Sequence, residues 1–167
     1  LIARKQGIAG KMTALKIAED VEAGAEVCGL GMFDQGYYDK LGFGTGNYSY
    51  WHTIPLAALK IKGKARMPKR LTKNEYEIVN KSMQNRLRCH GSFSVTSDLL
   101  GGIIKTGGIG FGYYDDKGNL THHFWMSDSK LEGGPLAIRW MAYETYDQFF
   151  ELMRLIKSFE EQIVSIK

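Results

Sequence analysis

The stretch Arg4-Lys5-Gln6-Gly7-Ile8-Ala9-Gly10-Lys11 forms a basic, glycine-containing turn directly ahead of a helical pattern. Apolar residues then recur at helical spacing until Gly24, so the sequence predicts a helix over residues 7–23. The first N–H groups of a helix have no partner within it, and this end of the helix carries a partial positive charge. Gly7 and Gly10 let a ligand approach that backbone closely. The stretch therefore indicates a site for an anion such as a pyrophosphate.

Three further elements are expected before a boundary near residue 66. The stretch from Glu26 to Met32 has the length and composition of a short strand. A helical turn begins at Asp34 and ends at Gly42, and another strand is expected between Tyr48 and Leu56. The charged, glycine- and proline-containing stretch that follows is typical of a linker, which places the boundary.

The second half of the chain alternates helices and strands. Thr72 and Glu75 have the spacing of a capping box, which predicts a helix over residues 73–88. Strands are expected over 103–114 and 120–126, joined by a polar turn that is typical of a hairpin. The remaining expected elements are a strand at 136–143, a helix from 146 to 156 and a strand at 163–166. This order predicts an α+β unit.

Two motifs carry a resemblance to a known superfamily. Neither a Walker A pattern nor the dinucleotide-binding glycine pattern is present, which argues against ATP and NAD. Arg4-x-x-Gly7-x-Ala9 instead resembles the R/Q-x-x-G-x-G/A motif with which GNAT acetyltransferases hold the pyrophosphate of acetyl-CoA. Downstream, Tyr37-Tyr38-Asp39-Lys40-Leu41-Gly42-Phe43 is similar to the Y-x-x-x-G-F segment of the same superfamily. The two motifs follow each other in the order and at the distance usual there.

The order of segments further resembles the enhanced-intracellular-survival (Eis) branch of this superfamily. Residues 46–56 are similar to the end of its first GNAT unit, and residues 67–167 to its second unit, which lacks the pyrophosphate motif. The resemblance implies an α+β fold of tandem GNAT-like (acyl-CoA N-acyltransferase) units. Residues 1–66 would be the C-terminal half of the first and residues 67–167 a degenerate second one. It also implies a homo-oligomer and an internal fragment of a longer protein, one that would fold poorly and be inactive alone.

The resemblance implies an acetyl-CoA-dependent N-acetyltransferase, and no metal is expected because the Cys and His residues lack a metal-ligand spacing. The residues expected to hold acetyl-CoA are Arg4, Lys5, Gln6, Gly7, Ile8, Ala9, Gly10 and Lys11. Tyr38 is expected to be the catalytic group that donates a proton to the leaving thiolate, while the adjacent Tyr37 points about 100° away on the helix. The acceptor, a small-molecule or peptide amine, and the general base stay open. A catalytically inactive GNAT-like scaffold or CoA-binding module is the alternative.

The distribution of charge along the chain does not favour a polyanion as a partner. The net charge is +4, and the one local cluster of basic residues, between Lys60 and Arg70, lies where a solvated linker is expected. A nucleic-acid-binding module is therefore the least favoured class, and nucleic acid is an unlikely partner.

The other indications are negative or structural. Cys28 and Cys89 are too few for a disulfide framework, which fits a reducing, cytoplasmic location, and no metal-ligand spacing is present. No apolar stretch approaches the roughly 20 residues needed to cross a bilayer. His122 and His123 alternate across a predicted strand, so one of them is expected to face the core in a structural role.

Overall fold

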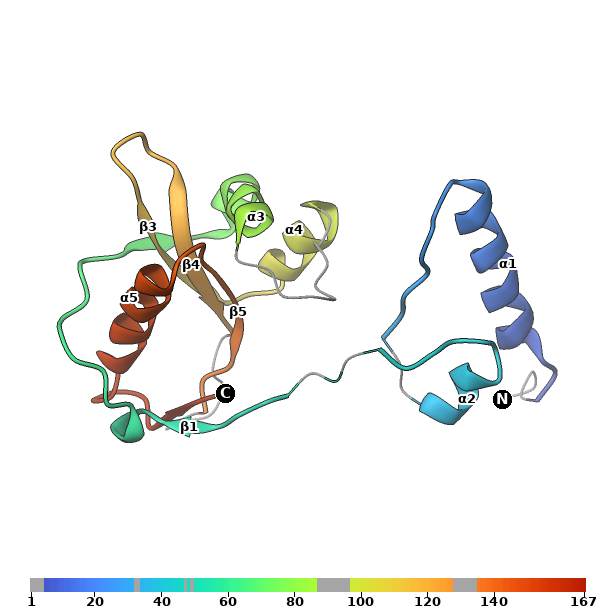
Figure 1. Cartoon of the computed structure of the whole chain (residues 1–167), viewed down its shortest axis with the longest axis horizontal. Coiled ribbons are helices and arrows are strands. Elements are labelled where there is room, and N and C mark those ends of the chain that lie inside the picture. Colours follow the sequence, from blue (N-terminus) through green and yellow to red (C-terminus); the bar gives the residue numbers. More distant parts are fainter. Residues whose placement is uncertain (1–4, 32–33, 47, 49, 87–96, 128–134) are drawn as a thin grey trace. The chain divides into compact units, whose positions relative to one another are not determined.

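The computed structural model describes residues 5–31, 34–46, 48, 50–86, 97–127 and 135–167. The chain divides into two compact units, residues 1–49 and Tyr50–Lys167 (Figure 1). This break precedes residue 66, and the division into two GNAT-like domains at that residue stays a prediction. None of the helices in the described part has the length and apolar character that a membrane crossing requires.

The described residues of the first unit form two helices, both where the sequence predicts them. Helix α1 (Ile8–Glu22) starts after Gly7, and Gly24 beyond its end has a φ of 89°, a left-handed conformation that favours glycine. Helix α2 (Gln35–Asp39) begins at Asp34, whose carboxylate accepts a hydrogen bond (3.2 Å) from the backbone N–H three residues later. Both predicted helices are confirmed.

The strand predicted over residues 26–32 is absent from its described part. Residues 26–31 follow α1 without joining a ladder (Figure 1). Composition indicated a strand there, but a strand forms only when a neighbour supplies backbone hydrogen bonds, and no described segment of this unit does so. Similarly, among the described residues of the strand expected between 48 and 56, only Ile54–Pro55 form a strand.

The second unit is built on a four-stranded antiparallel sheet with the order β2-β3-β4-β5. The strands are β2 (Lys69–Leu71), β3 (Ile109–Tyr114), β4 (Leu120–Met126) and β5 (Ile138–Ala142). The predicted hairpin is the central pair, β3 and β4. A smaller antiparallel pair joins β1 (Ile54–Pro55) to β6 (Ser165–Ile166).

The hairpin turn is held by the side chain of its first residue. The Asp115 carboxylate accepts hydrogen bonds from the backbone N–H groups of Lys117 (3.0 Å) and Asn119 (2.8 Å). Gly118 has a φ of 80°, which a residue with a side chain rarely adopts. These contacts confirm the turn predicted from the polar sequence.

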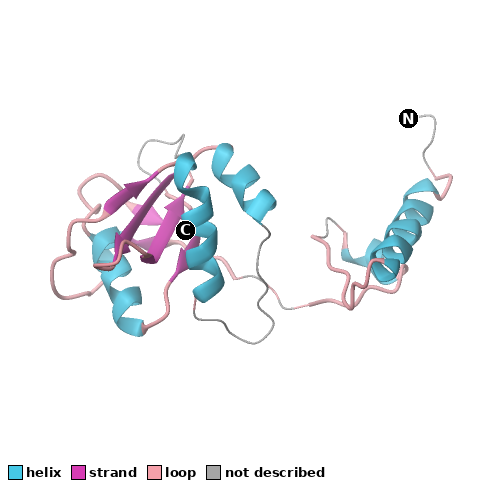
Figure 2. Ribbon diagram, turned by 90° about the horizontal axis from the view of Figure 1, so that it is seen from above, coloured by secondary structure: helices cyan, strands magenta, loops and turns pink. Residues whose placement is uncertain are grey.

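Helices cover both faces of this sheet (Figure 2). Helix α5 (Tyr146–Lys157) packs on the face that carries Phe124, whereas α3 (Tyr76–Asn85) and α4 (Ser97–Lys105) cover the face that carries Trp125. The predicted capping box of Thr72 and Glu75 is formed, and it opens a short 3₁₀ turn, η2 (Lys73–Glu75), ahead of α3. A second capping box, of Thr145 with Gln148, opens α5 and was not predicted.

Because both faces are covered, neighbouring residues of β4 are buried on opposite sides. His122 faces α5 and His123 faces α3, and they are 3% and 0% exposed. The prediction that only one of them faces the core is wrong, because it assumed a sheet with one face in water. That their role is structural stays a prediction.

Helix α4 was not predicted, because its last residues were assigned to a strand over 103–114. Leu100 and Ile104 are buried (1% and 2% exposed) four residues apart, which is helical spacing. The glycine pair between them obscured that periodicity. Strand β3 therefore starts at Ile109, after the helix has ended.

Residues 56–66, which we call the strap, belong to the second unit and pack along its helix α5. The strap opens with a 3₁₀ turn, η1 (Leu56–Ala58), and Leu56 is completely buried. Lys157 of α5 donates a hydrogen bond to the Leu56 carbonyl and Arg154 Nε donates one to the Lys62 carbonyl, both at 2.9 Å. Residues that were expected to form a solvated linker are thus fixed along one helix.

Candidate functional site

The N-terminus of α1 has the backbone shape that the motif predicts. Gly7 is its N-cap in a left-handed conformation (φ 72°), and Lys5 shares that conformation with a φ of 65°. No side chain caps the helix, and its first turn contains no acidic residue. The first intrahelical hydrogen bond runs from the Lys11 N–H to the Gly7 carbonyl (3.1 Å). This helix end can therefore present backbone donors to an anion.

The other predicted cofactor-binding residues surround this turn. Lys5, Gln6, Ile8 and Ala9 are exposed, whereas Gly10 is half-buried, with Leu41 Cδ2 3.6 Å from where its Cβ would lie. Arg4 lies outside the described residues. The backbone around Gly7 is open, since a Cβ added there would meet no atom within 4 Å.

Tyr38 lies in α2, and the turn that follows this helix fixes its backbone through hydrogen bonds. Its carbonyl accepts hydrogen bonds from the N–H groups of Leu41 (2.9 Å) and Phe43 (3.2 Å), while Gly42 between them has a φ of 88°. The Tyr38 ring is half-buried and packs edge-on against Phe43, with ring centroids 5.9 Å apart. The predicted Y-x-x-x-G-F segment thus positions one tyrosine ring through the turn at its own end.

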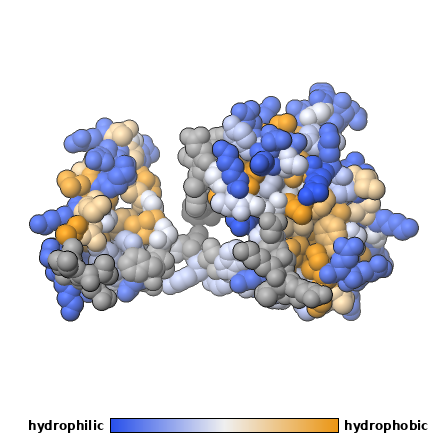
Figure 3. All heavy atoms as spheres, turned by 180° about the vertical axis from the view of Figure 1, so that it is seen from behind, coloured by the Kyte–Doolittle hydropathy of each residue, from blue (hydrophilic) through white to orange (hydrophobic). Residues whose placement is uncertain are grey.

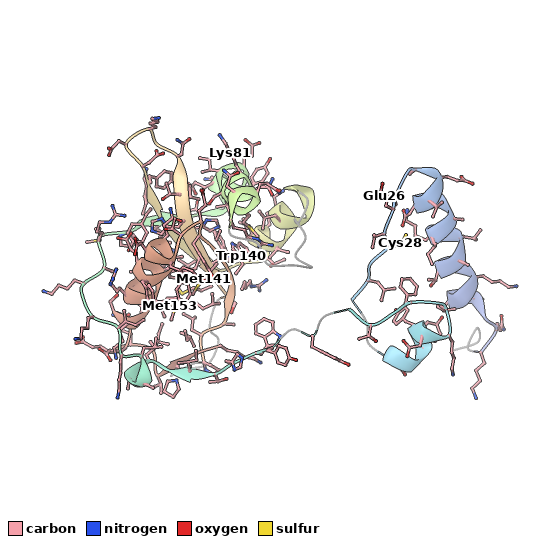
Figure 4. All side chains as sticks on the ribbon, viewed as in Figure 1. Glu26, Cys28, Lys81, Trp140, Met141 and Met153 are labelled. Carbon is pink, nitrogen blue, oxygen red and sulfur yellow. The ribbon has the colours of Figure 1, made fainter. Side chains whose placement is uncertain are left out.

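A cavity of about 330 Å³ joins Tyr38 to α1. It is lined by Met12, Lys16, Cys28, Leu30, Tyr38 and Phe43, among others. Cys28 lies on the segment that follows α1 (Figure 4). The structure therefore brings the predicted catalytic residue against the helix whose N-terminus carries the predicted phosphate turn, although that turn does not itself line the cavity.

The first unit leaves much of its apolar surface in water. No residue of α1 is buried, and Met12 and Leu15 are 64% and 66% exposed. Apolar atoms are visible at the surface of this unit in Figure 3. The helical pattern in the sequence correctly identified the helix, although the described residues of this unit leave most of its apolar side chains exposed.

A polar cluster that sequence reasoning missed lies between the strap and α5. Arg66 Nε and Nη2 donate to the two carboxylate oxygens of Glu151, at 2.5 and 2.7 Å. His122 Nε2 lies 3.0 Å from Glu151 Oε2. The bond from Arg66 lowers the pKa of Glu151, whereas burial lowers the pKa of His122 despite the carboxylate. No sequence spacing signals this cluster, because its members come from three separate elements.

The ring of Tyr113 completes the cluster, because it contacts both the His122 imidazole and the Arg66 guanidinium. Its ring stacks on His122 with centroids 4.8 Å apart, and the Arg66 guanidinium carbon lies 5.0 Å from the ring centre. The hydroxyl donates to the Arg66 carbonyl (3.0 Å). Burial raises the pKa of Tyr113 to about 12, so this phenol stays protonated and serves as a donor.

Ser82 and His123 form a buried pair that looks like a nucleophile with its base. Ser82 Oγ lies 3.1 Å from His123 Nδ1, and the Trp140 indole N–H donates to His123 Nε2 (3.2 Å). An indole nitrogen is only a donor, so Nε2 must hold the lone pair and Nδ1 the proton. His123 then donates to Ser82 and cannot accept its proton. Burial lowers the pKa of His123 to about 3, which keeps the ring neutral.

The fold has a counterpart among solved structures. A conserved protein of unknown function from Enterococcus faecalis V583, described as a probable N-acyltransferase, matches 98% of this chain with a TM-score of 0.74 and 18% sequence identity. The chain spans 42% of the length of that protein. The likeness shows an α+β fold that resembles part of a probable N-acyltransferase. No protein-family profile and no curated protein matches the sequence.

Proposed function

We propose that this chain is part of an N-acetyltransferase that moves the acetyl group of acetyl-CoA to an amine. The observation that carries this proposal is the side-chain-free, left-handed N-cap at Gly7, which opens a helix with no capping side chain. It occurs in a fold that resembles part of a probable N-acyltransferase. The motif read from the sequence falls on this N-cap.

The residues present suit the phosphates of acetyl-CoA. The space around Gly7 is open, and the exposed Lys5 and Lys11 add positive charge on either side of it. Residues 4–11 would hold the pyrophosphate through their backbone N–H groups, with Arg4 as a further cation. The bound cosubstrate would supply an acetyl group activated as a thioester.

Tyr38 is the proposed proton donor for the thiolate that leaves. Its phenol is half-buried beside a cavity that α1 also lines. Acetyl transfer releases a thiolate, whose departure is favoured by a nearby hydrogen-bond donor. The attacking amine must be neutral, and no described residue is assigned as its base.

The second unit would shape the acceptor side of a tandem, Eis-like enzyme that assembles as a homo-oligomer. It carries no pyrophosphate motif and is built around a four-stranded sheet that helices cover on both faces. The proposed acceptor is a small-molecule or peptide amine. This arrangement rests on the sequence resemblance together with the α+β fold.

A non-catalytic CoA-binding scaffold is the second candidate, and one observation favours it. The described residues of the first unit contain no strand, although an acetyltransferase of this kind needs a sheet beside its cosubstrate. Such a scaffold would keep the Gly7 turn and bind CoA without turnover.

The two candidates differ in a single assay. The protein that contains this chain is mixed with acetyl-CoA and, in turn, a polyamine, an aminoglycoside and a lysine peptide, and the CoA thiol is measured with a thiol-reactive dye. Amine-dependent thiol release supports the transferase. CoA binding by calorimetry with no release supports the scaffold, and absence of CoA binding refutes both.

A further inference from the structure

A chain of hydrogen bonds with a fixed direction runs through the second unit and stops at a cavity. Trp140 donates to His123, which must therefore donate to Ser82. The Ser82 oxygen is thus an acceptor, and its own hydrogen remains to be donated. Among the described residues, no other hydrogen bond involves the Ser82 side chain, although the residue is only 6% exposed. The Ser82 hydroxyl therefore keeps a hydrogen to donate to a group outside this chain of hydrogen bonds.

Ser82 lines a cavity of about 420 Å³ between α3, the hairpin turn and the segment after β5. The polar groups that line it with Ser82 include Lys81 and Asn85 from α3, Asp115 and Asn119 from the turn, and Glu144. Lys81 projects from the outer side of α3, at the rim of the unit (Figure 4). A space of this size is typical of small-molecule sites.

The charges around the cavity restrict what can occupy it. Lys81 contributes one positive charge, whereas Asp115 and Glu144 contribute two negative ones. A simple anion would meet more negative than positive charge, and a simple cation would leave the Ser82 hydrogen without an acceptor. A ligand with an acceptor oxygen for Ser82 and Lys81 and a cationic nitrogen for the carboxylates suits all of these groups.

We propose that this cavity binds an amino acid or a similarly small zwitterion. Its carboxylate accepts the Ser82 hydrogen and lies toward Lys81, and its ammonium group lies toward Glu144. Asp115 contributes less, because its oxygens already accept hydrogen bonds from the turn. The site lies wholly in the second unit and does not depend on acetyl transfer at Tyr38.

The direction of the hydrogen-bond chain is tested first. In the ¹⁵N-labelled protein that contains this chain, NMR of the imidazole nitrogens of His123 should show the proton on Nδ1 and a lone pair on Nε2. The opposite tautomer would let Ser82 donate to His123, and it would overturn the proposal.

Binding is tested with glycine as the probe and with acetate and methylammonium as its two halves, each titrated against backbone amide shifts. Glycine should bind in about the millimolar range and more tightly than either half. Ser82→Ala should weaken glycine binding about tenfold, since one hydrogen bond to a charged group is lost. Ser127→Ala, at a partly buried serine elsewhere in this unit, should not.

Two rim variants keep the test decisive should Ser82→Ala fail to fold. Lys81→Met and Glu144→Gln alter exposed residues, so the fold is retained. Lys81→Met should weaken both glycine and acetate, whereas Glu144→Gln should weaken glycine and leave acetate unchanged or tighter. Acetate that binds as tightly as glycine, or glycine binding that neither variant alters, would refute the assignment.

Discussion

Arg66 and Glu151 form a two-point ion pair across 85 residues of sequence, with both guanidinium-to-carboxylate distances at 2.7 Å or below. Glu151 is the less exposed partner (16%, against 66% for Arg66), and it also contacts the buried His122. The pair therefore joins the end of the strap to α5. Its carboxylate also gives the buried His122 a hydrogen-bond partner.

Glu151→Gln should lower the free energy of unfolding by about 1 to 2 kcal/mol, because the carboxylate that accepts from both Arg66 nitrogens becomes a neutral amide with one acceptor oxygen. Urea denaturation measures the change. Glu161→Gln, at an exposed glutamate of the same unit, is the control and should have little effect. An equal stability of the two variants would show that the ion pair contributes nothing.

The second unit should lose stability as the pH falls below about 6.5. The pKa of His123 is about 3 in the folded chain and 6.5 when unperturbed, so between these values the unfolded chain binds more protons. The free energy of unfolding therefore rises with pH through this window, and the contribution is complete above it. The lowered pKa of His122 acts in the same direction. Denaturation at a series of pH values tests this, and a stability that stays constant from pH 7 to pH 4 would contradict it.

Gly110→Ala should destabilise the second unit by about 1 to 3 kcal/mol. A Cβ at Gly110 would lie 2.5 Å from Trp125 Cε3 and 2.9 Å from Leu71 Cβ, so the indole ring would have to move. Gly102→Ala is the matched control, because a Cβ there meets no atom within 4 Å and the residue lies on an exposed position of α4. Thermal unfolding should separate them, with Gly102→Ala neutral or stabilising; a similar loss in both would point to a general intolerance of alanine.

Gly7→Glu should sharply weaken the binding of CoA. The left-handed backbone at Gly7 disfavours any side chain, and a carboxylate there would face the phosphates. Calorimetric titration of CoA into the protein that contains this chain measures the effect. Gly44→Glu, at an exposed glycine of the same unit, controls for the added charge. Unchanged CoA affinity in Gly7→Glu would remove the turn from the proposed site.

Tyr38→Phe should lower kcat roughly 100-fold while CoA affinity changes little, because the ring remains and only the proton donor is lost. Steady-state kinetics with any accepted amine tests this. Tyr37→Phe, at the neighbouring ring 5.1 Å away, should have a much smaller effect. Full activity of Tyr38→Phe, or a larger loss in Tyr37→Phe, would exclude Tyr38 from catalysis.

Local signals in the sequence located most helices and the central hairpin. The glycine that follows α1, the Asp34 cap, the capping box at Thr72 and the polar hairpin turn act within a few residues, so they can be read directly. The strand expected over residues 26–32 is not formed in its described part. A strand depends on a partner elsewhere in the chain, which local signals do not reveal.

The candidate sites divide in the same way. The Gly7 turn and Tyr38 lie in short motifs, and the structure gives both the predicted local shape, although their roles stay predictions. The bonds between Ser82 and His123 and between Arg66 and Glu151 join residues 41 and 85 positions apart. A single sequence holds no record of such pairs, so only the folded chain reveals them.

The strap has a consequence for the order of events during synthesis. Leu56 is synthesised 101 residues before Lys157, the residue of α5 that donates a hydrogen bond to the Leu56 carbonyl. At usual rates of translation this interval is about 5 to 20 s. Throughout it, the apolar side chains of Leu56, Leu59 and Ile61 lack the helix that covers them. A nascent chain of this protein should therefore bind chaperones through residues 56–61 until α5 has emerged.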